Sequence, residues 1–243
     1  MNKVVLITGA SGGIGKEIAI SFGRAGYKVA LCYNKNSDGA EKLKELLALN
    51  DIEAETFFCD LSDFSRAKKL GEAVAKRFGR IDALINNAGV EHYSIFTDTE
   101  EKDYREVFDV NVGGALAVSA GVIPFMLGRG GSIVNISSVW GVCGGSGEVL
   151  YSASKAALIG FTKALAKEVA GSKIRVNCIA PGAIDTPMLD RFSEEEKNEI
   201  INSTPLGRLG SGQDVADLSL FLCSHSADFI TGQVIGSNGG FQI

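Results

Sequence analysis

Short apolar runs alternate with stretches of helical spacing along the whole chain, and this alternation strongly constrains the fold. Several of the runs are apolar at every position, as expected of strands that helices cover on both faces of a parallel sheet. The order strand–helix–strand predicts an α/β fold with a doubly wound, seven-stranded parallel sheet. The expected strands are Val4–Thr8, Lys28–Tyr33, Glu53–Cys59, Ala83–Asn86, Ser132–Ser137, Arg175–Ala180 and Gln233–Ile235, and the expected helices include Ser37–Asn50, Ser62–Phe78, Thr99–Leu127, Tyr151–Ala170 and Gly212–Ser224.

The chain is expected to form one domain over residues 1–243, because no linker, internal repeat or low-complexity tract divides it. With 243 residues, 45% of them hydrophobic, it is long enough to bury a full core. The formal net charge is −5, from 24 basic and 29 acidic residues. This balance argues against a nucleic-acid or anionic-membrane partner, since both require a basic face.

The cysteines and the uncharged segments indicate in which cellular compartment the protein is expected. The five cysteines are widely spread and form no C-x-x-C or Cys/His cluster, so we expect neither disulfides nor a metal site. The first apolar run is too short for a signal peptide. Residues 110–128 carry no charge over nearly the length of a membrane span, but they include Asn111 and Pro124 and are expected to form a buried helix. A cytoplasmic protein is therefore predicted.

A glycine-rich segment, Thr8–Gly15, follows the first expected strand and precedes a helical pattern that begins at Lys16. Glycines at such a junction let the backbone approach a pyrophosphate, and the helix N-terminus directs its free N–H groups at the phosphates. Alone, such a segment is a weak signal. Its position at the first strand-to-helix junction predicts a Rossmann-type dinucleotide site.

The end of the second strand bears on the choice of dinucleotide. An acidic residue there would bind the ribose hydroxyls of NAD, but this chain has Asn34 and Lys35 and no acid before Asp38. Lys35 can neutralise a 2′-phosphate and Asn34 can donate a hydrogen bond to it. We therefore expect NADP(H) to be favoured over NAD(H).

Tyr151 and Lys155 lie four residues apart and hence on one face of a helix. An ammonium beside a phenol stabilises phenolate, so we expect Lys155 to lower the pKa of Tyr151 and make it an effective proton donor near neutral pH. Two further polar residues accompany this pair: Ser138 at a strand end and Asn111 in the uncharged segment.

Together these motifs resemble those of the classical short-chain dehydrogenase/reductase family, over essentially the whole chain. The resemblance implies that Tyr151 is the general acid toward a carbonyl oxygen and that Ser138 polarises this carbonyl. It also implies that Lys155 binds the nicotinamide ribose and tunes Tyr151, while Asn111 holds a water that relays protons. The motifs are T-G-x-x-x-G-x-G at Thr8–Gly15, Asp60, Asn86–Gly89, Asn111, Ser138, Tyr151 with Lys155, and Pro181-Gly182.

The resemblance extends to the cofactor contacts. It implies that Asp60 meets the adenine, that Asn87 and Gly89 lie on the adenosine ribose side, and that Ile184 and Thr186 flank the nicotinamide. The full set of expected cofactor residues is Gly9, Ser11, Gly13, Ile14, Gly15, Asn34, Lys35, Asp60, Leu61, Asn87, Ala88, Gly89, Tyr151, Lys155, Pro181, Gly182, Ile184 and Thr186.

Within the family the chain is similar to the 3-oxoacyl-(acyl carrier protein) reductases of fatty-acid synthesis, through Thr204–Gly210 and Phe229–Ile235. That similarity implies a homotetramer and an acyl carrier protein as partner. Gly12 stands where that group usually carries Arg, which removes one phosphate partner.

The segment Gly147–Leu150, with Trp140, looks more like that of the elongation factor P 5-aminopentanone reductases, so elongation factor P is the alternative partner. A carboxylate at Glu148 would attract a cationic substrate. The alternative is that Glu148 pairs with a nearby base or faces water. Trp140 either walls the substrate site or simply packs. The expected substrate contacts are Ser138, Trp140, Glu148 and Tyr151.

Residues 187–205 are rich in charge and would overhang the carboxyl ends of the strands, as either a mobile substrate lid or a static surface helix. Overall, the sequence favours an NADPH-dependent ketoreductase of a small or carrier-bound carbonyl. One alternative is an NAD-dependent alcohol or sugar dehydrogenase. Another is a dinucleotide-sensing scaffold without turnover, although a pure binder would need none of Asn111, Ser138, Tyr151 and Lys155.

Overall fold

The computed structural model describes residues 3–242 and contains one sheet of seven parallel strands, in the order β3-β2-β1-β4-β5-β6-β7. This is the predicted doubly wound fold, and each strand end lies within two residues of its expected position. The strands are β1 (Val4–Thr8), β2 (Lys28–Tyr33), β3 (Ala54–Phe58), β4 (Ala83–Asn86), β5 (Gly131–Ile136), β6 (Ile174–Pro181) and β7 (Val234–Ser237).

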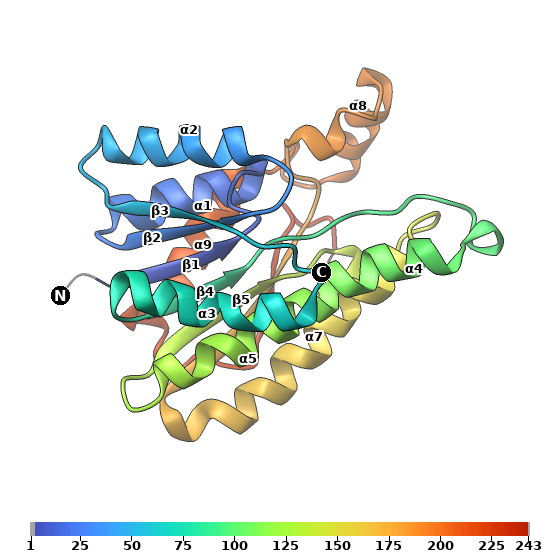
Figure 1. Cartoon of the computed structure of the whole chain (residues 1–243). Coiled ribbons are helices and arrows are strands. Elements are labelled where there is room, and N and C mark those ends of the chain that lie inside the picture. Colours follow the sequence, from blue (N-terminus) through green and yellow to red (C-terminus); the bar gives the residue numbers. More distant parts are fainter. Residues whose placement is uncertain (1–2, 243) are drawn as a thin grey trace.

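Helices cover both faces of the sheet (Figure 1). On one face α1 (Gly13–Arg24), α2 (Ser37–Ala48) and α9 (Gly212–Cys223) enclose one apolar core. On the other, α3 (Phe64–Phe78), α5 (Ala115–Met126) and α7 (Val149–Val169) enclose a second core. Strand β1 lies at the centre with all five residues buried, because its side chains point alternately into the two cores.

The helix expected over Thr99–Leu127 is not continuous. It consists of α4 (Glu101–Phe108), a π-helix over Asp109–Gly114, and α5. The wider π turn coincides with the buried Asn111, and π segments of this kind are frequent at functional sites. The combined helix is long and apolar enough to span a membrane by length and composition, but half of its most apolar window is buried inside the protein. This agrees with the expectation of a buried helix.

Two glycines allow α3 and α5 to pack backbone to backbone. A Cβ on Gly121 would collide with the carbonyl oxygen of Lys68, and one on Gly71 would collide with the carbonyl oxygen of Gly121. Side chains larger than hydrogen would therefore push the two helices apart.

A buried polar chain links the sheet to α7. The Asn86 side-chain amide donates to Asn135 Oδ1 at 2.8 Å, and the Asn135 amide donates in turn to Thr162 Oγ1 at 2.8 Å. Asn86 also donates to Ser119 Oγ in α5 at 3.0 Å. This chain of hydrogen bonds fixes how α7 lies on β4 and β5.

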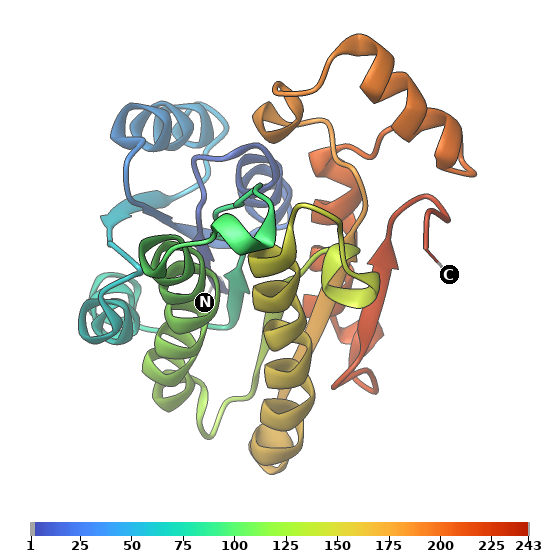
Figure 2. The same cartoon turned by 90° about the vertical axis from the view of Figure 1, so that its right-hand side faces the viewer.

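Residues 187–205, here called the lid segment, project from the carboxyl ends of the strands (Figure 2, orange). They contain a short 3₁₀-helix (Pro187–Leu189) and α8 (Glu194–Ser203), which starts with a capping box between Ser193 and Glu196. None of the residues of α8 is buried, so few contacts hold this helix on the body of the protein. The remaining helical elements are α6 (Trp140–Cys143) and 3₁₀-helices at Phe96–Asp98, Ala170–Ser172 and His225–Ala227.

Candidate active site

One large cleft, of about 1400 Å³, opens where the carboxyl ends of the central strands meet. Ligands of doubly wound sheets bind at this edge, and the volume is large enough for a dinucleotide together with a substrate. All residues expected to contact cofactor or substrate line it; Asn111 does not. These lining residues are Gly9, Ser11, Gly13, Ile14, Gly15, Asn34, Lys35, Asp60, Leu61, Asn87, Ala88, Gly89, Ser138, Trp140, Glu148, Tyr151, Lys155, Pro181, Gly182, Ile184 and Thr186.

The glycine-rich turn is held against the loop that follows β4. Gly9 has φ +64°, and a Cβ there would lie 2.9 Å from Ala88 Cα, so this position requires glycine. The Asn87 side chain donates to the carbonyls of Thr8 and Gly9 at 3.0 and 3.1 Å. The N-cap Gly12 provides no side-chain cap, so the first turn of α1 keeps N–H groups for a ligand in the cleft.

At the far end of the cleft lie Asn34 and Lys35 after β2 and Asp60 after β3. The Asp60 carboxylate accepts hydrogen bonds from Ser62 N and Ser62 Oγ at 3.1 and 2.8 Å. These bonds, with the nearby charges of Arg66 and Lys35, hold its pKa below the usual value. The expected adenine-side residues are thus brought together.

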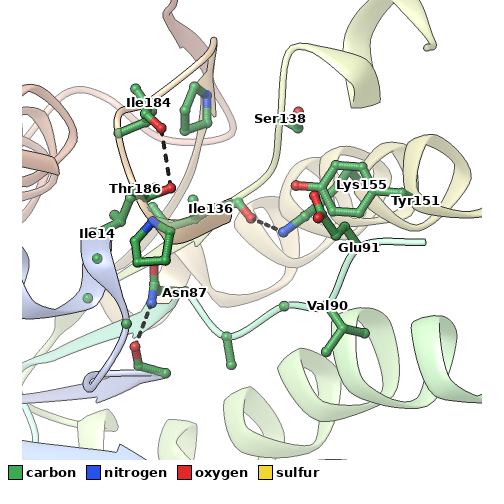
Figure 3. A pocket seen from close by; sticks show the side chains of 18 of the residues that line it. Ile14, Asn87, Val90, Glu91, Ile136, Ser138, Tyr151, Lys155, Ile184 and Thr186 are labelled. Carbon is green, nitrogen blue, oxygen red and sulfur yellow. Dashed lines mark hydrogen bonds between the residues drawn. The ribbon is translucent and has the colours of Figure 1, made fainter. Parts of the chain in front are cut away.

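Helix α7 presents Tyr151 and Lys155 to the cleft one turn apart, and Ser138, which follows β5, lies near the Tyr151 hydroxyl (Figure 3). Lys155 Nζ lies 5.5 Å from the centre of the Tyr151 ring and donates to the carbonyl of Ile136 at 2.9 Å. The Tyr151 hydroxyl and Ser138 point toward the same space in Figure 3. Two hydroxyl groups are therefore close together in this part of the cleft.

The prediction that Lys155 lowers the pKa of Tyr151 is wrong, because this pKa is raised in the structure. Burial raises the pKa of Tyr151, and the carboxylates of Glu148 and Glu91 raise it further, whereas the hydrogen bond with Ser138 and the charge of Arg191 lower it. Burial also lowers the pKa of Lys155 to about 8. Lys155 is buried and donates its hydrogen bond to the carbonyl of Ile136, not to the Tyr151 hydroxyl. It therefore does not lower the pKa of Tyr151 as the four-residue spacing predicted.

The Asn111 side chain forms its hydrogen bonds with protein groups. It is 1% exposed, accepts from Val90 N at 2.8 Å, and donates to the carbonyl of Val90 at 2.9 Å and to Ser154 Oγ at 3.0 Å. These bonds tie the loop after β4 to α7. A relay water at this residue would have to use its backbone carbonyl in the π-helix.

Glu148 is not free to meet a substrate, because it pairs with a base. Its Oε1 accepts from Arg191 Nη2 at 2.9 Å, and Arg191 Nη1 lies 3.2 Å from Glu91 Oε1. Burial raises the pKa of Glu91, Arg191 lowers it, and Glu148 raises it. Of the two readings of Glu148, the structure supports the ion pair.

Several cleft residues were not foreseen from the sequence. Arg191 and Phe192 come from the lid segment, and Phe241 comes from the C-terminal end, where its ring packs edge-on against Trp140 at 5.7 Å. Trp140 thus both lines the cleft and packs. Arg191 and Phe192 fall in the segment predicted as a lid over the cleft, but nothing local in the sequence marks these two residues or Phe241 individually.

Comparisons with known proteins identify the family of this chain. A family model described as enoyl-(acyl carrier protein) reductase matches residues 9–242. The chain is 42% identical to an uncharacterized oxidoreductase of Bacillus subtilis over the whole of both chains. It is 40% identical to a 3-oxoacyl-[acyl-carrier-protein] reductase of Thermotoga maritima, over 99% of this chain and 98% of the relative. A Staphylococcus aureus protein with that same name is 37% identical, over 100% of this chain and 99% of the relative. The chain belongs to the classical short-chain dehydrogenase/reductase family.

As a short-chain dehydrogenase/reductase, the chain is an NAD(P)-dependent oxidoreductase similar to the 3-oxoacyl-[acyl-carrier-protein] reductases. The described residues fit a nicotinamide dinucleotide, because the glycine-rich turn lines the cleft and the N-terminus of α1 is not capped by a side chain. The pyrophosphate would lie at this turn and the nicotinamide near Tyr151, Ile184 and Thr186.

Proposed function

We propose that this protein is an NADPH-dependent ketoreductase that reduces the carbonyl of a carrier-bound 3-oxoacyl group to a secondary alcohol. The observation that carries this proposal is the convergence of the Tyr151 and Ser138 hydroxyls beside Lys155, in the same cleft as the glycine-rich turn. Two hydroxyl donors aimed at one point suit a carbonyl oxygen better than an isolated carbon–carbon double bond.

The chain's own residues divide the work of reduction. When bound, NADPH supplies the hydride. Ser138 Oγ hydrogen-bonds and polarises the carbonyl, and Tyr151 delivers the proton to its oxygen. Raising the pKa of Tyr151 by burial keeps the phenol protonated before the reaction. Lys155 binds the nicotinamide ribose, and Asn111 holds the loop at Val90 against α7 so that this wall of the cleft stays in place.

The preference for NADPH over NADH is supported by charge. Lys35 and Asn34 line the cleft after β2, where an added phosphate on the ribose would lie, and no acidic side chain replaces them. Position 12 is Gly, so the arginine that usually contacts the phosphate at this position is absent. The expected advantage of NADPH therefore depends on Lys35.

A second candidate is the reduction of the 5-aminopentanone-modified lysine of elongation factor P. It is favoured by the two carboxylates of Glu91 and Glu148, which lie in the cleft beside Tyr151. An acidic cleft suits an amine-bearing ketone and does not help a thioester on an acidic carrier protein. In this structure Arg191 pairs with both carboxylates, so a cationic substrate would have to displace it.

The experiment compares wild type with Tyr151→Phe. Wild type should oxidise NADPH faster than NADH with acetoacetyl thioester, and Tyr151→Phe should lose at least about a hundredfold in kcat/KM while its affinity for NADPH changes little. Comparable rates for the two proteins would contradict the role of proton donor. A higher kcat/KM of wild type for an amino-ketone than for the thioester would instead support the second candidate, reduction of the modified lysine of elongation factor P.

We also propose a cytoplasmic homotetramer. Large apolar side chains remain exposed on the single chain, with Phe229 fully exposed and Leu206 70% exposed. Covering exposed apolar side chains of this size with a second copy of the chain would stabilise the assembly.

A further inference from the structure

Arg191 connects three parts of the molecule that are far apart in the sequence. It belongs to the lid segment, and its guanidinium pairs with Glu91 in the loop after β4 and with Glu148 at the N-cap of α7. It also lies over the rings of Tyr93 and Phe192, 5.3 and 4.7 Å from their centres. The side chain of Glu148 in this contact is only 10% exposed and that of Arg191 31%.

The ion pairs of Arg191 are the main polar contacts between the lid segment and the rest of the protein. Within the part of the chain that the structure describes, the polar contacts from residues 187–203 to segments beyond their flanking residues are these two ion pairs of Arg191. The other polar contacts there are local, such as the capping box of Ser193 and the pair of Lys197 with Glu194. Because α8 buries none of its residues, apolar packing does little to replace them.

We propose that Arg191 is a positioning residue for carbonyl reduction: by pairing with Glu91 and Glu148 it holds the lid segment over the cleft and keeps a positive charge beside Tyr151. The proposal deepens the function given above and rests on it, because it takes Tyr151 as the proton donor. Arg191 acts on the reaction through these carboxylates and through the closed lid, without touching the carbonyl itself.

The electrostatic part follows from the groups that face Tyr151. Glu148 from the N-cap of α7 and Glu91 from the loop after β4 both raise the pKa of Tyr151, whereas Arg191 from the lid segment lowers it. Lys155, from the next turn of α7, lies against the ring. Withdrawing Arg191 would leave two unneutralised carboxylates in a half-buried space beside the phenol and would raise its pKa further. Closing the lid therefore makes proton donation easier.

The experiment measures lid closure and catalysis separately, with Arg191→Gln, Arg191→Lys and the matched control Lys197→Gln. The control removes a positive charge from the same lid segment whose partner, Glu194, lies on the same helix. Hydrogen exchange of the amides of residues 187–203 is followed on the full chain without substrate. We expect exchange at least about fivefold faster in Arg191→Gln than in wild type, an intermediate rate in Arg191→Lys, and the wild-type rate in Lys197→Gln.

Steady-state reduction of the thioester gives the second measurement. Arg191→Gln should lose about tenfold in kcat/KM, and Arg191→Lys should recover part of it. Reduction needs Tyr151 protonated, so a higher pKa of Tyr151 moves the alkaline decline of kcat/KM to higher pH. That shift is expected in Arg191→Gln and not in Lys197→Gln, and a purely structural role of Arg191 would not produce it.

Each result decides a part of the proposal. Equal exchange in Arg191→Gln and Lys197→Gln would show that Arg191 does not hold the lid. Faster exchange with an unchanged alkaline decline and unchanged kcat/KM would overturn the role in positioning. A wild-type protein inactive with both the thioester and the amino-ketone would contradict the proposed function, while the exchange rates would still decide whether Arg191 closes the lid.

Discussion

Lys155 shows how much the surroundings of one side chain change its chemistry. It is 3% exposed, and burial lowers its pKa to about 8. The ordinary value for lysine is near 10.4, so between these two values the unfolded chain binds a proton that the folded protein has released. The free energy of unfolding must then rise with pH across this interval, because stability increases wherever the unfolded state binds more protons.

This gives a prediction for Lys155→Met. Urea unfolding at pH 8 and pH 10 should show wild type gaining roughly 2 to 3 kcal/mol relative to the variant as pH rises. Lys163→Met removes an exposed lysine from the same helix and should show no such gain. An equal difference in stability at both pH values would mean that Lys155 remains hydrated in the folded protein.

Residues that act through local spacing could be predicted from the sequence, and residues that act through distant contacts could not. The glycine-rich turn and the pair Tyr151 with Lys155 are visible because each lies within one turn of the chain. The pair of Arg191 with Glu148 joins residues 43 positions apart, and no local pattern reveals it. The pKa of Tyr151 differs from the prediction chiefly because burial raises it, and burial depends on the whole fold. Glu148, three residues before Tyr151, raises this pKa further, and Glu91 also raises it from the loop after β4.

At the scale of elements, strands were more predictable than the helix after β4. The apolar run Val4–Ile7 has few alternatives to a buried strand, and the structure has a strand over Val4–Thr8, with the expected bounds. The π-helix at Asp109–Gly114 leaves no mark in the hydrophobic pattern, because the apolar residues there continue on both sides of the wider turn. Its signal lies in the buried contacts of Asn111.

The close packing of α3 and α5 leads to a prediction for Gly121→Ala. The added methyl group would collide with the backbone at Lys68, so we expect a loss of roughly 2 to 4 kcal/mol in the free energy of unfolding, measured by urea denaturation. Gly171→Ala is the control, because a Cβ at Gly171 meets nothing within 4 Å. A loss in Gly121→Ala no larger than in the control would show that the helices can separate freely.

At the scale of the whole molecule, the exposed apolar side chains bear on assembly. Light scattering after size exclusion should give a mass about four times the 25.6 kDa of one chain. Phe229→Asp should shift the protein to a smaller species, since a charge in a covered apolar contact costs desolvation free energy. A wild-type monomer at micromolar concentration would contradict the proposed homotetramer.

The buried hydrogen bonds from Asn86 through Asn135 to Thr162 have a consequence for how the protein reaches its native state. The hydrogen bond from Asn135 to Thr162 forms only when α7 has one rotation and one depth on the sheet. Any rotated arrangement would leave amide groups stranded in an apolar interior, at about 1 to 3 kcal/mol for each. Rotated arrangements of α7 are therefore disfavoured during folding, so Tyr151 on this helix reaches the cleft in its final orientation without a later adjustment.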